Sequence, residues 1–326
     1  MVLNKAVLAF DTSNYTTSIA LMDLAGRLLG HQRRMLIVPE GQRGLRQSDA
    51  LFQHVRELPG LLEALKSPLE KISLTAVGCS DRPRRVEGSY MPVFLAGESI
   101  ARSLATVAGV PCHAFSHQEG HLAAGLWSLG LSPETPFYAL HLSGGTTELL
   151  RVTPLPDGGF SESIVGATAD ISLGQLIDRT GVALGLPFPA GPSLERLAGE
   201  CREDPFDIPF SLTTQPLRMS LSGPENFLRQ RISDTSPERI ASSLFHFSGK
   251  LLSLLVRKAC EKEALPMLIT MGGVAANGVV RESMQHRLKT LPLTIHHTQR
   301  EWCSDNAAGT ASLLVKALTH PQSLQP

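Results

Sequence analysis

Two stretches of the chain, about 130 residues apart, share the same order of expected elements. Residues 6–30 form an apolar strand, a polar turn, a second strand, a glycine turn and a third strand. Residues 137–163 repeat that order, with an Asp-Gly-Gly turn before the third strand. Repetition at this distance predicts a duplicated domain rather than a solenoid of short repeats. Because helical patterns follow each unit, the predicted fold class is α/β with two similar halves.

Hydrophobic periodicity places helices after both three-strand units. Pro59 should end or kink the first of them, and short strands are expected at 110–115 and 265–271. The helices are expected at 49–66, 97–108, 117–129, 171–184, 193–200, 236–263 and 306–318.

The prolines between residues 133 and 136 predict a domain boundary. The chain is therefore divided into an N-terminal domain of residues 1–132 and a C-terminal domain of residues 133–326. The helix at 306–318 is expected to pack back on the first domain.

Composition fits two ordinary cores, with 42% apolar and 18% charged residues in a chain of 326. The chain has 30 Lys and Arg residues and 30 Asp and Glu residues, so its formal net charge is zero. A nucleic-acid partner would therefore need a local basic patch. Five scattered cysteines without a C-x-x-C pair indicate a reducing compartment, and a cytoplasmic location is expected. No apolar stretch is long enough for a signal peptide or a membrane span.

Small polar loops follow the first strand of each repeated unit. Asp11, Thr12 and Ser13 open the first loop, which runs to Thr17 through Asn14. Ser143, Gly144 and Gly145 open the second loop. Each loop alone fits an ordinary Ser/Thr-rich hairpin, but two at equivalent places favour phosphate binding through hydroxyls and backbone N–H groups.

A third glycine loop, Gly272-Gly273, follows the strand at 265–271 and precedes a helix. Glycines at the carboxyl end of a strand leave room for a nucleotide. Asn277 could contact a base or ribose there, or it could cap the next helix.

His117 and His121 are four residues apart, so on a helix they lie on one face and could hold one metal ion. A purely structural role for the pair is the alternative. Asp305 is the best candidate for a third ligand, although it could equally cap the last helix. A zincin peptidase needs Glu directly after the first His, where Gln118 stands, so peptidase chemistry is rejected.

Arginines cluster weakly at 33–34 and at 82–85. Such short clusters fit solvated loop charges, and they would also fit contact with a polyanion such as an RNA backbone.

Taken in order, six motifs resemble the TsaD (Gcp) family, which adds threonylcarbamoyl to tRNA and was formerly described as O-sialoglycoprotein endopeptidase. The resemblance covers nearly the full length. The motifs are FDTSNYTTSIAL, SHQEGHLAAG, LSGGTTEL, IDRTGVALGLPFPAGP, MGGVAANGVVRE and CSDNAAGTA.

This resemblance implies a duplicated actin-like ATPase (RNase H-like) fold around a nucleotide cleft, and one divalent metal ion, iron or zinc, held by His117, His121 and Asp305. It implies a substrate, threonylcarbamoyl-AMP or ATP, and an acyl transfer to the adenosine beside the tRNA anticodon. A TsaB-like paralog and a small TsaE-like ATPase are expected as partners. The implied substrate contacts are Ser143, Gly144, Gly145, Asp178, Gly191, Gly273 and Asn277.

Several family positions differ in this chain. Tyr15 and Thr16 stand where the family usually has an Asp-Glu pair, and Thr146 stands where it has His. Ile171 replaces one Asp of a pair, and Gln175 replaces a Glu. A family segment with a Gly-Pro-Gly turn is replaced by SDRPRRVEGSYMPVFLAG. Such changes are typical of a divergent paralog.

Three hypotheses follow from this pattern. The first is an active tRNA threonylcarbamoyltransferase. The second is a non-catalytic nucleotide- and metal-binding paralog that acts as a partner or regulator. The third is a small-molecule kinase of the same fold, which needs a carboxylate in its cleft. Asp11 could supply that carboxylate, but the histidine pair has no role in such an enzyme.

Overall fold

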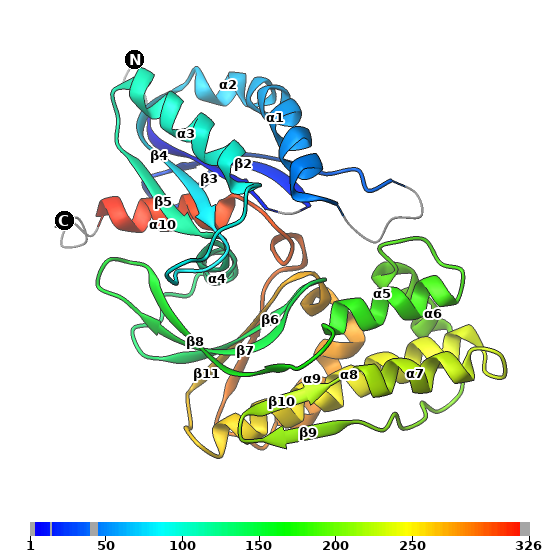
Figure 1. Cartoon of the computed structure of the whole chain (residues 1–326). Coiled ribbons are helices and arrows are strands. Elements are labelled where there is room, and N and C mark those ends of the chain that lie inside the picture. Colours follow the sequence, from blue (N-terminus) through cyan, green and yellow to red (C-terminus); the bar gives the residue numbers. More distant parts are fainter. Residues whose placement is uncertain (1–3, 14, 40–44, 320–326) are drawn as a thin grey trace. The chain divides into compact units, whose positions relative to one another are not determined.

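The computed structural model describes residues 4–13, 15–39 and 45–319, and the chain divides into two compact units (Figure 1). Unit 1 comprises Met1–Ser132, Pro154–Ser161 and Asp305–Pro326. Unit 2 comprises Pro133–Thr153 and Glu162–Ser304. The chain therefore leaves unit 1, returns briefly for one β-turn, and returns again for its last helix.

Unit 1 contains a five-stranded sheet in the order β3-β2-β1-β4-β5. The first three strands are antiparallel neighbours, whereas β4 and β5 continue the sheet in parallel with β1. The strands are β1 (Asn4–Thr12), β2 (Thr16–Asp23), β3 (Leu28–Met35), β4 (Ile72–Arg82) and β5 (Cys112–Ser116).

Helices cover both faces of this sheet (Figure 1). On one face, α1 (Gln47–Ala64) and α3 (Phe94–Ala108) pack on a core that includes Phe10 and Ile19. On the other face lie α4 (His117–Ser128) and α10 (Ala308–Thr319). Burial on both faces explains why β1 and β2 read as nearly continuous apolar runs rather than alternating ones.

Close backbone contact holds α10 against α4. A Cβ atom on Gly309 would lie 1.8 Å from the carbonyl oxygen of Gly120, so no larger residue fits at this crossing. The crossing fixes the start of α10 beside the first turn of α4.

Unit 2 contains a seven-stranded sheet in the order β12-β11-β6-β7-β8-β10-β9. Its central helix α8 (Pro237–Cys260) is the longest described, and Leu244, Leu251 and Leu255 of this helix are fully buried. The strands are β6 (Phe137–Leu142), β7 (Thr147–Pro154), β8 (Phe160–Thr168), β9 (Ser211–Thr214), β10 (Leu217–Ser220), β11 (Met267–Met271) and β12 (Thr294–His297).

The other helices of unit 2 are α5 (Leu173–Ala183), α6 (Gly191–Glu200), α7 (Ser222–Arg231) and α9 (Gly278–Leu288). Among them, α6 and α9 pack on α8, α5 packs on α6 and α7, and all contribute to one core. Shorter helical turns are α2 (Lys66–Leu69) in unit 1, and η1 (Gly273–Ala276) and η2 (Arg300–Trp302) in unit 2.

The predicted α/β class and the repeated three-strand unit are confirmed, since β1-β2-β3 and β6-β7-β8 are adjacent in their sheets. Of the two outcomes expected at Pro59, the helix does not end there, because α1 continues to Ala64, while a kink stays a prediction. Leu58 and Leu61, on either side of Pro59, are buried in the core. Their burial offsets the cost of one missing helical hydrogen bond, about 3 kcal/mol.

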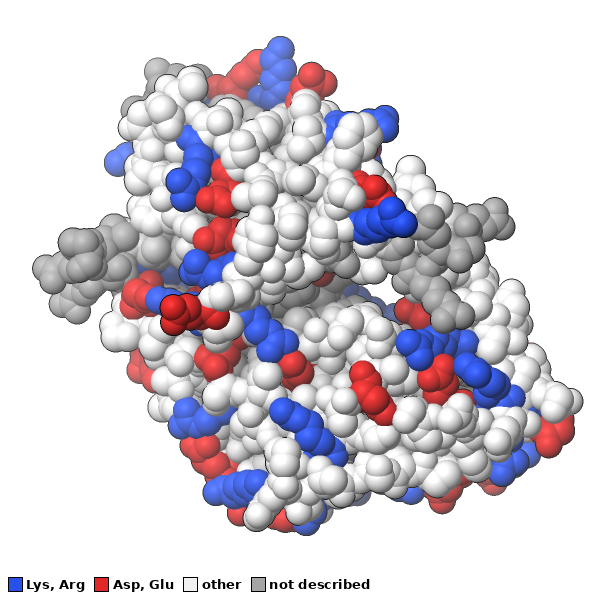
Figure 2. Space-filling view, in the orientation of Figure 1, with Lys and Arg blue, Asp and Glu red and all other residues white. Residues whose placement is uncertain are grey.

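Charged side chains of both signs are interspersed on the face that Figure 2 shows, as their equal numbers would lead one to expect. Within the described ranges, no helix is both long enough and apolar enough to cross a membrane.

Candidate metal centre

Three side chains of unit 1 converge on one point, as the sequence predicted for a metal site. His121 Nε2 lies 3.1 Å from Asp305 Oδ1, and His117 Nε2 lies 3.5 Å from the same oxygen. The two imidazole Nε2 atoms are 3.1 Å apart. One ligand atom from each residue falls within 4.8 Å of the others, close enough for the three to be candidate ligands of a single cation.

Local sequence explains why these residues meet. Ser116 and Glu119 form a capping box, so α4 begins at His117 and both imidazoles lie on its first turns. Asp305 precedes α10, whose start is held beside α4 at Gly309. Asp305 does not cap α10, because the neighbouring Asn306 accepts the hydrogen bond from the backbone N–H of Ala308.

Residues of the first polar loop surround the triad. Asp11 Oδ1 lies 3.0 Å from His117 Nδ1, and the Ser13 hydroxyl donates to Asp305 Oδ2 at 2.7 Å. Asp11 is 1% exposed, and its second oxygen, Oδ2, has no hydrogen-bond partner in the described part of the chain. A carboxylate behind a histidine fixes the ring and its tautomer, which is a common arrangement behind metal ligands.

His54 holds the same loop from α1, and the sequence analysis did not identify it. Its Nε2 lies 2.6 Å from the Ser13 carbonyl oxygen, and its Nδ1 lies 2.8 Å from the Thr17 hydroxyl. Burial lowers the pKa of this fully enclosed imidazole, so it is neutral at pH 7. The available signal was its position at helical spacing between the buried residues Ala50 and Leu58.

Charge in the triad is strongly coupled. Burial disfavours the charged form of His117, but the carboxylates of Asp11 and Asp305 outweigh it and raise the pKa of His117 to about 10. Burial likewise acts against the Asp305 carboxylate, yet hydrogen bonds to both histidines hold its pKa well below the usual range. The cluster therefore stabilises a positive charge at its centre, whether a proton or a cation supplies it.

The side chains assigned to a phosphate loop have partners within unit 1. Besides the contacts of Asp11 and Ser13, the Thr12 hydroxyl donates to Val93 O at 3.0 Å and accepts from Gly97 N at 3.1 Å. A phosphate contact by these three residues stays a prediction, and Asn14 lies outside the described residues.

In unit 2 the second polar loop is open to solvent. Gly144 and Gly145 are exposed, and the Ser143 hydroxyl accepts hydrogen bonds from the N–H groups of Gly145 and Thr146. The loop rests on the start of α5, where a Cβ atom on Gly174 would lie 2.5 Å from Ser143 O. The Ser172 hydroxyl donates to Gly144 O at 2.7 Å.

The remaining predicted substrate contacts also belong to unit 2. Asp178 accepts a hydrogen bond from the N–H of Ala190 at 2.8 Å, one residue before Gly191, and burial raises the pKa of its carboxyl group. Gly273 is exposed at the start of η1. Asn277 accepts from Val280 N at 2.9 Å and thus caps α9, while a contact with a base or ribose stays a prediction.

The predicted arginine clusters form ion pairs within unit 1. Arg85 binds both Glu119 and Asp157, and Arg34 binds Glu57. Glu119 is therefore occupied by the capping box and by Arg85, in agreement with the rejection of peptidase chemistry.

Comparison with known proteins identifies the family. Residues 40–312 match the model of the family "TsaD: tRNA N6-adenosine threonylcarbamoyltransferase". The chain belongs to this family. A relative from Nitrosomonas europaea, the "tRNA N6-adenosine threonylcarbamoyltransferase", is 30% identical over 311 residues, which cover 93% of this chain and 89% of the relative.

Solved structures agree with an actin-like ATPase fold for this family member. HypF of T. kodakarensis superposes with a TM-score of 0.62 at 14% identity, covering 97% of this chain and 48% of HypF. Component A of the (R)-2-hydroxyglutaryl-CoA dehydratase of Acidaminococcus fermentans gives 0.56 at 14% identity, covering 98% and 99%. At these identities the likeness concerns the fold alone.

Gln175, at a position that differs from the family, and Asp170, beside the differing Ile171, have structural roles. Gln175 completes a capping box with Ser172 at the start of α5. Asp170 accepts hydrogen bonds from the Ser220 hydroxyl and from the N–H groups of Leu221 and Ser222. These hydrogen bonds outweigh the effect of burial and lower the pKa of Asp170.

Proposed function

We propose that this chain is a tRNA N6-adenosine threonylcarbamoyltransferase. It would transfer the threonylcarbamoyl group of threonylcarbamoyl-AMP to the exocyclic amine of the adenosine beside the tRNA anticodon. The observation that carries the proposal is the family match over residues 40–312, joined to a triad whose ligand atoms lie within 4.8 Å of one another.

The donor set of the triad fits a divalent ion such as zinc or iron. Two imidazoles and one carboxylate are borderline ligands that both metals accept. The unpartnered Asp11 Oδ2 and the raised pKa of His117 both indicate a centre that favours positive charge. When bound, the ion would supply a Lewis acid for an oxygen of the substrate.

The chain's own residues would orient the reactants rather than form a covalent intermediate. The substrate is a mixed anhydride and therefore already activated. The adenosine nitrogen attacks the carbamoyl carbon, the bond from that carbon to the phosphate oxygen breaks, AMP departs, and the amine loses one proton. Such a reaction depends on positioning and on stabilisation of the developing negative charge.

Each predicted residue has a place in this scheme. Asp11 would orient His117, and Ser13 would orient Asp305. The exposed backbone at Gly144 and Gly145 would approach a phosphate of the substrate, with Asp178, Gly191, Gly273 and Asn277 contributing to the nucleotide site.

A reconstituted transfer assay tests the proposal. Purified protein is incubated with threonylcarbamoyl-AMP and unmodified tRNA, with and without the expected TsaB-like and TsaE-like partners, and the nucleosides are analysed by mass spectrometry. We expect modified adenosine from wild type and none from His121→Ala. Absence of product under every condition would exclude the transferase.

A second candidate function is favoured by the departures from the family. Tyr15 and Thr16 supply no carboxylate beside the triad, and Thr16 is buried. A non-catalytic paralog that binds nucleotide and metal as a partner or regulator would retain the triad without these acids. This hypothesis predicts that calorimetry detects nucleotide binding without turnover, whereas rescue of a transferase-deficient strain by this gene would argue against it.

The cytoplasmic location remains a prediction.

A further inference from the structure

A second cluster of charge lies in unit 2, in an open groove between the C-terminal halves of α8 and α9. The groove has a volume of about 450 Å3. Four of the nine residues that line it are Lys or Arg, and none is acidic. The cations are Lys250 and Arg257 from α8, Arg287 from α9, and Lys289 just after α9.

Helix geometry gathers these cations on one face. Lys250, Ser253 and Arg257 are spaced by three and four residues, so they form one stripe along α8. From Lys250 to Arg257 this stripe spans two turns, or about 10 Å. The charges are thus spread along a line rather than directed at one point.

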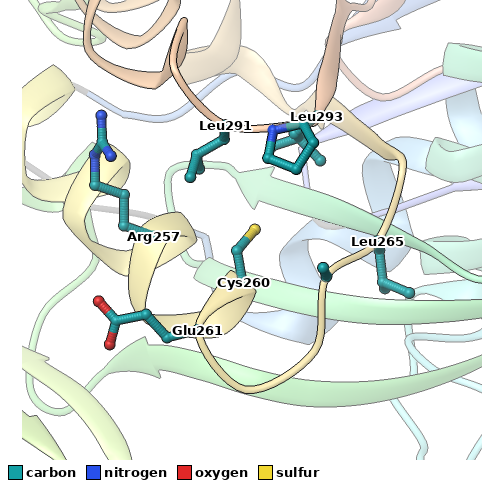
Figure 3. Close-up of a pocket in the computed structure, with 8 residues that line it drawn as sticks. Arg257, Cys260, Glu261, Leu265, Leu291 and Leu293 are labelled. Atoms are coloured by element: carbon teal, nitrogen blue, oxygen red, sulfur yellow. The ribbon is translucent and has the colours of Figure 1, made fainter.

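Few acidic groups neutralise the groove. Lys250 pairs with Asp207, whose side chain is 88% exposed. Glu261 lies near Arg257 in the neighbouring pocket, but Figure 3 shows the two side chains pointing apart. Glu261 forms its ion pair with Lys258 instead. Arg257 itself donates to Arg287 O and to the Thr290 hydroxyl.

The wall of the groove contains an unsatisfied polar group. Ser253 is 2% exposed, and its hydroxyl has no hydrogen-bond partner among the residues described. A buried hydroxyl without a partner costs about 1–3 kcal/mol, so such groups usually face a ligand or water. An anionic oxygen in the groove would supply the missing acceptor.

Basic residues in the last turn of a helix also offset the helix dipole, and this accounts for part of the cluster. It does not account for Lys250, which lies more than two turns before the end of α8. The cluster is also distinct from the predicted nucleotide contacts, because Asn277 caps the opposite end of α9. The 11 residues of α9 separate the two ends by about 16 Å.

We infer that this groove binds the phosphate backbone of the tRNA substrate, an inference that rests on the proposed function. A line of cations over two helical turns suits a chain of phosphates better than a single phosphate group. The groove would add affinity without base specificity and would hold the tRNA at a place remote from the reacting atoms.

Salt-dependent binding of tRNA tests the inference. Affinity is measured by fluorescence anisotropy between about 50 and 200 mM salt for wild type and for the triple variant Lys250→Gln, Arg287→Gln, Lys289→Gln. Each lost phosphate contact should reduce the slope of log K against log salt by about 0.7–0.9. We therefore expect a slope reduced by about 2–3 and an affinity at least about tenfold weaker at 0.1 M salt.

A matched control removes the same charges elsewhere. The variant Lys66→Gln, Lys71→Gln, Arg102→Gln also loses two lysines and one arginine, all exposed and in unit 1. It should leave both affinity and slope unchanged. An unchanged slope in the groove variant would overturn the inference.

A footprint on wild-type protein needs no substitution and so avoids any folding defect. Acetylation of Lys250 and Lys289, followed by mass spectrometry, should be suppressed by tRNA, whereas Lys66 and Lys71 should react as before. Equal reactivity with and without tRNA would contradict the inference. Competition by inorganic phosphate as strong as that by RNA, or binding only to acidic lipid vesicles, would overturn it as well.

The transfer assay keeps the two proposals separate. If wild type modifies tRNA but the groove variant binds tRNA normally, the groove inference fails and the transferase stands. If tRNA binding depends on the groove but no product forms, the transferase fails and the groove stands.

Discussion

The two polar loops that the sequence presents as equivalents differ in what their side chains do. In unit 1, Asp11, Thr12 and Ser13 are buried and hydrogen-bonded, and two of them contact the triad. In unit 2, Gly144 and Gly145 are exposed, and their backbone groups are held by the hydroxyls of Ser172 and Ser143. Duplication thus gave two similar hairpins, one supporting the His117-His121-Asp305 triad and the other leaving its glycine backbone exposed.

Sequence similarity between the repeats therefore determines the backbone path of each hairpin but not which contacts its loop makes. The first loop carries a carboxylate and a hydroxyl that contact His117 of α4 and Asp305, whereas the second carries glycines, which have no side chain to make such contacts. Substitutions in each unit test whether the two loops differ in this way.

The largest effect is expected from loss of a ligand in unit 1. His121→Ala removes one of the three donors, so metal affinity should fall by more than about 100-fold, since loss of an outer contact alone costs about 10–100-fold. Elemental analysis after dialysis against a chelator measures this. Retention of stoichiometric metal by the variant would show that the triad is not the binding site.

Asp11→Asn should have a smaller effect on the same centre. The amide keeps the shape but loses the charge that orients His117, so metal affinity should fall by about 10–100-fold. A competition titration with a metal-sensitive dye gives the value, and Thr12→Val serves as a control that alters the loop without touching His117. A drop in transfer with metal affinity unchanged would instead assign Asp11 a direct contact with substrate.

In unit 2, glycines of the open loop should respond differently from the glycine beneath it. Gly174→Ala would place Cβ 2.5 Å from Ser143 O, so it should destabilise the protein by about 1–3 kcal/mol and weaken nucleotide binding. Gly145→Ala meets nothing within 4 Å and should leave the unfolding midpoint unchanged. Chemical denaturation and calorimetry compare the two variants, and equal destabilisation would refute the distinction.

The smallest effect is a pH dependence of stability that both units share. Burial, with a nearby arginine, lowers the pKa of His31 in unit 1 and of His297 in unit 2 to about 4. The unfolded chain binds protons at these sites near pH 6.5, where the folded chain does not. Stability should therefore be highest above pH 6.5 and decline as the pH falls towards about 4. Thermal unfolding of His31→Asn and His297→Asn should each show a shallower decline than wild type.

Much of the fold could be predicted, because helices with a clear 3.6-residue period and the repeated hairpins carry their own signals. The strand β4 was missed, since Ser, Thr, Gly and Cys dilute its apolar pattern. The capping role of Asn306 rather than Asp305 could not be read from sequence, because both residue types cap helices equally well.

The site was predicted less completely than the fold. The helical spacing of His117 and His121 was visible, whereas the contribution of His54 depends on how α1 crosses the end of β1, a tertiary contact without a local signal. The basic groove of unit 2 was not anticipated for the same reason, since its cations come from segments about 40 residues apart.

The late return of the chain to unit 1 at Asp305 determines when the centre can assemble. Asp305 follows His121 by 184 residues, and all of unit 2 is synthesised between them. A chain truncated before Asp305 would therefore present the two imidazoles without their shared carboxylate, and a sheet face that α10 does not cover. Metal loading would then require that α10 has been synthesised and has docked on its own unit.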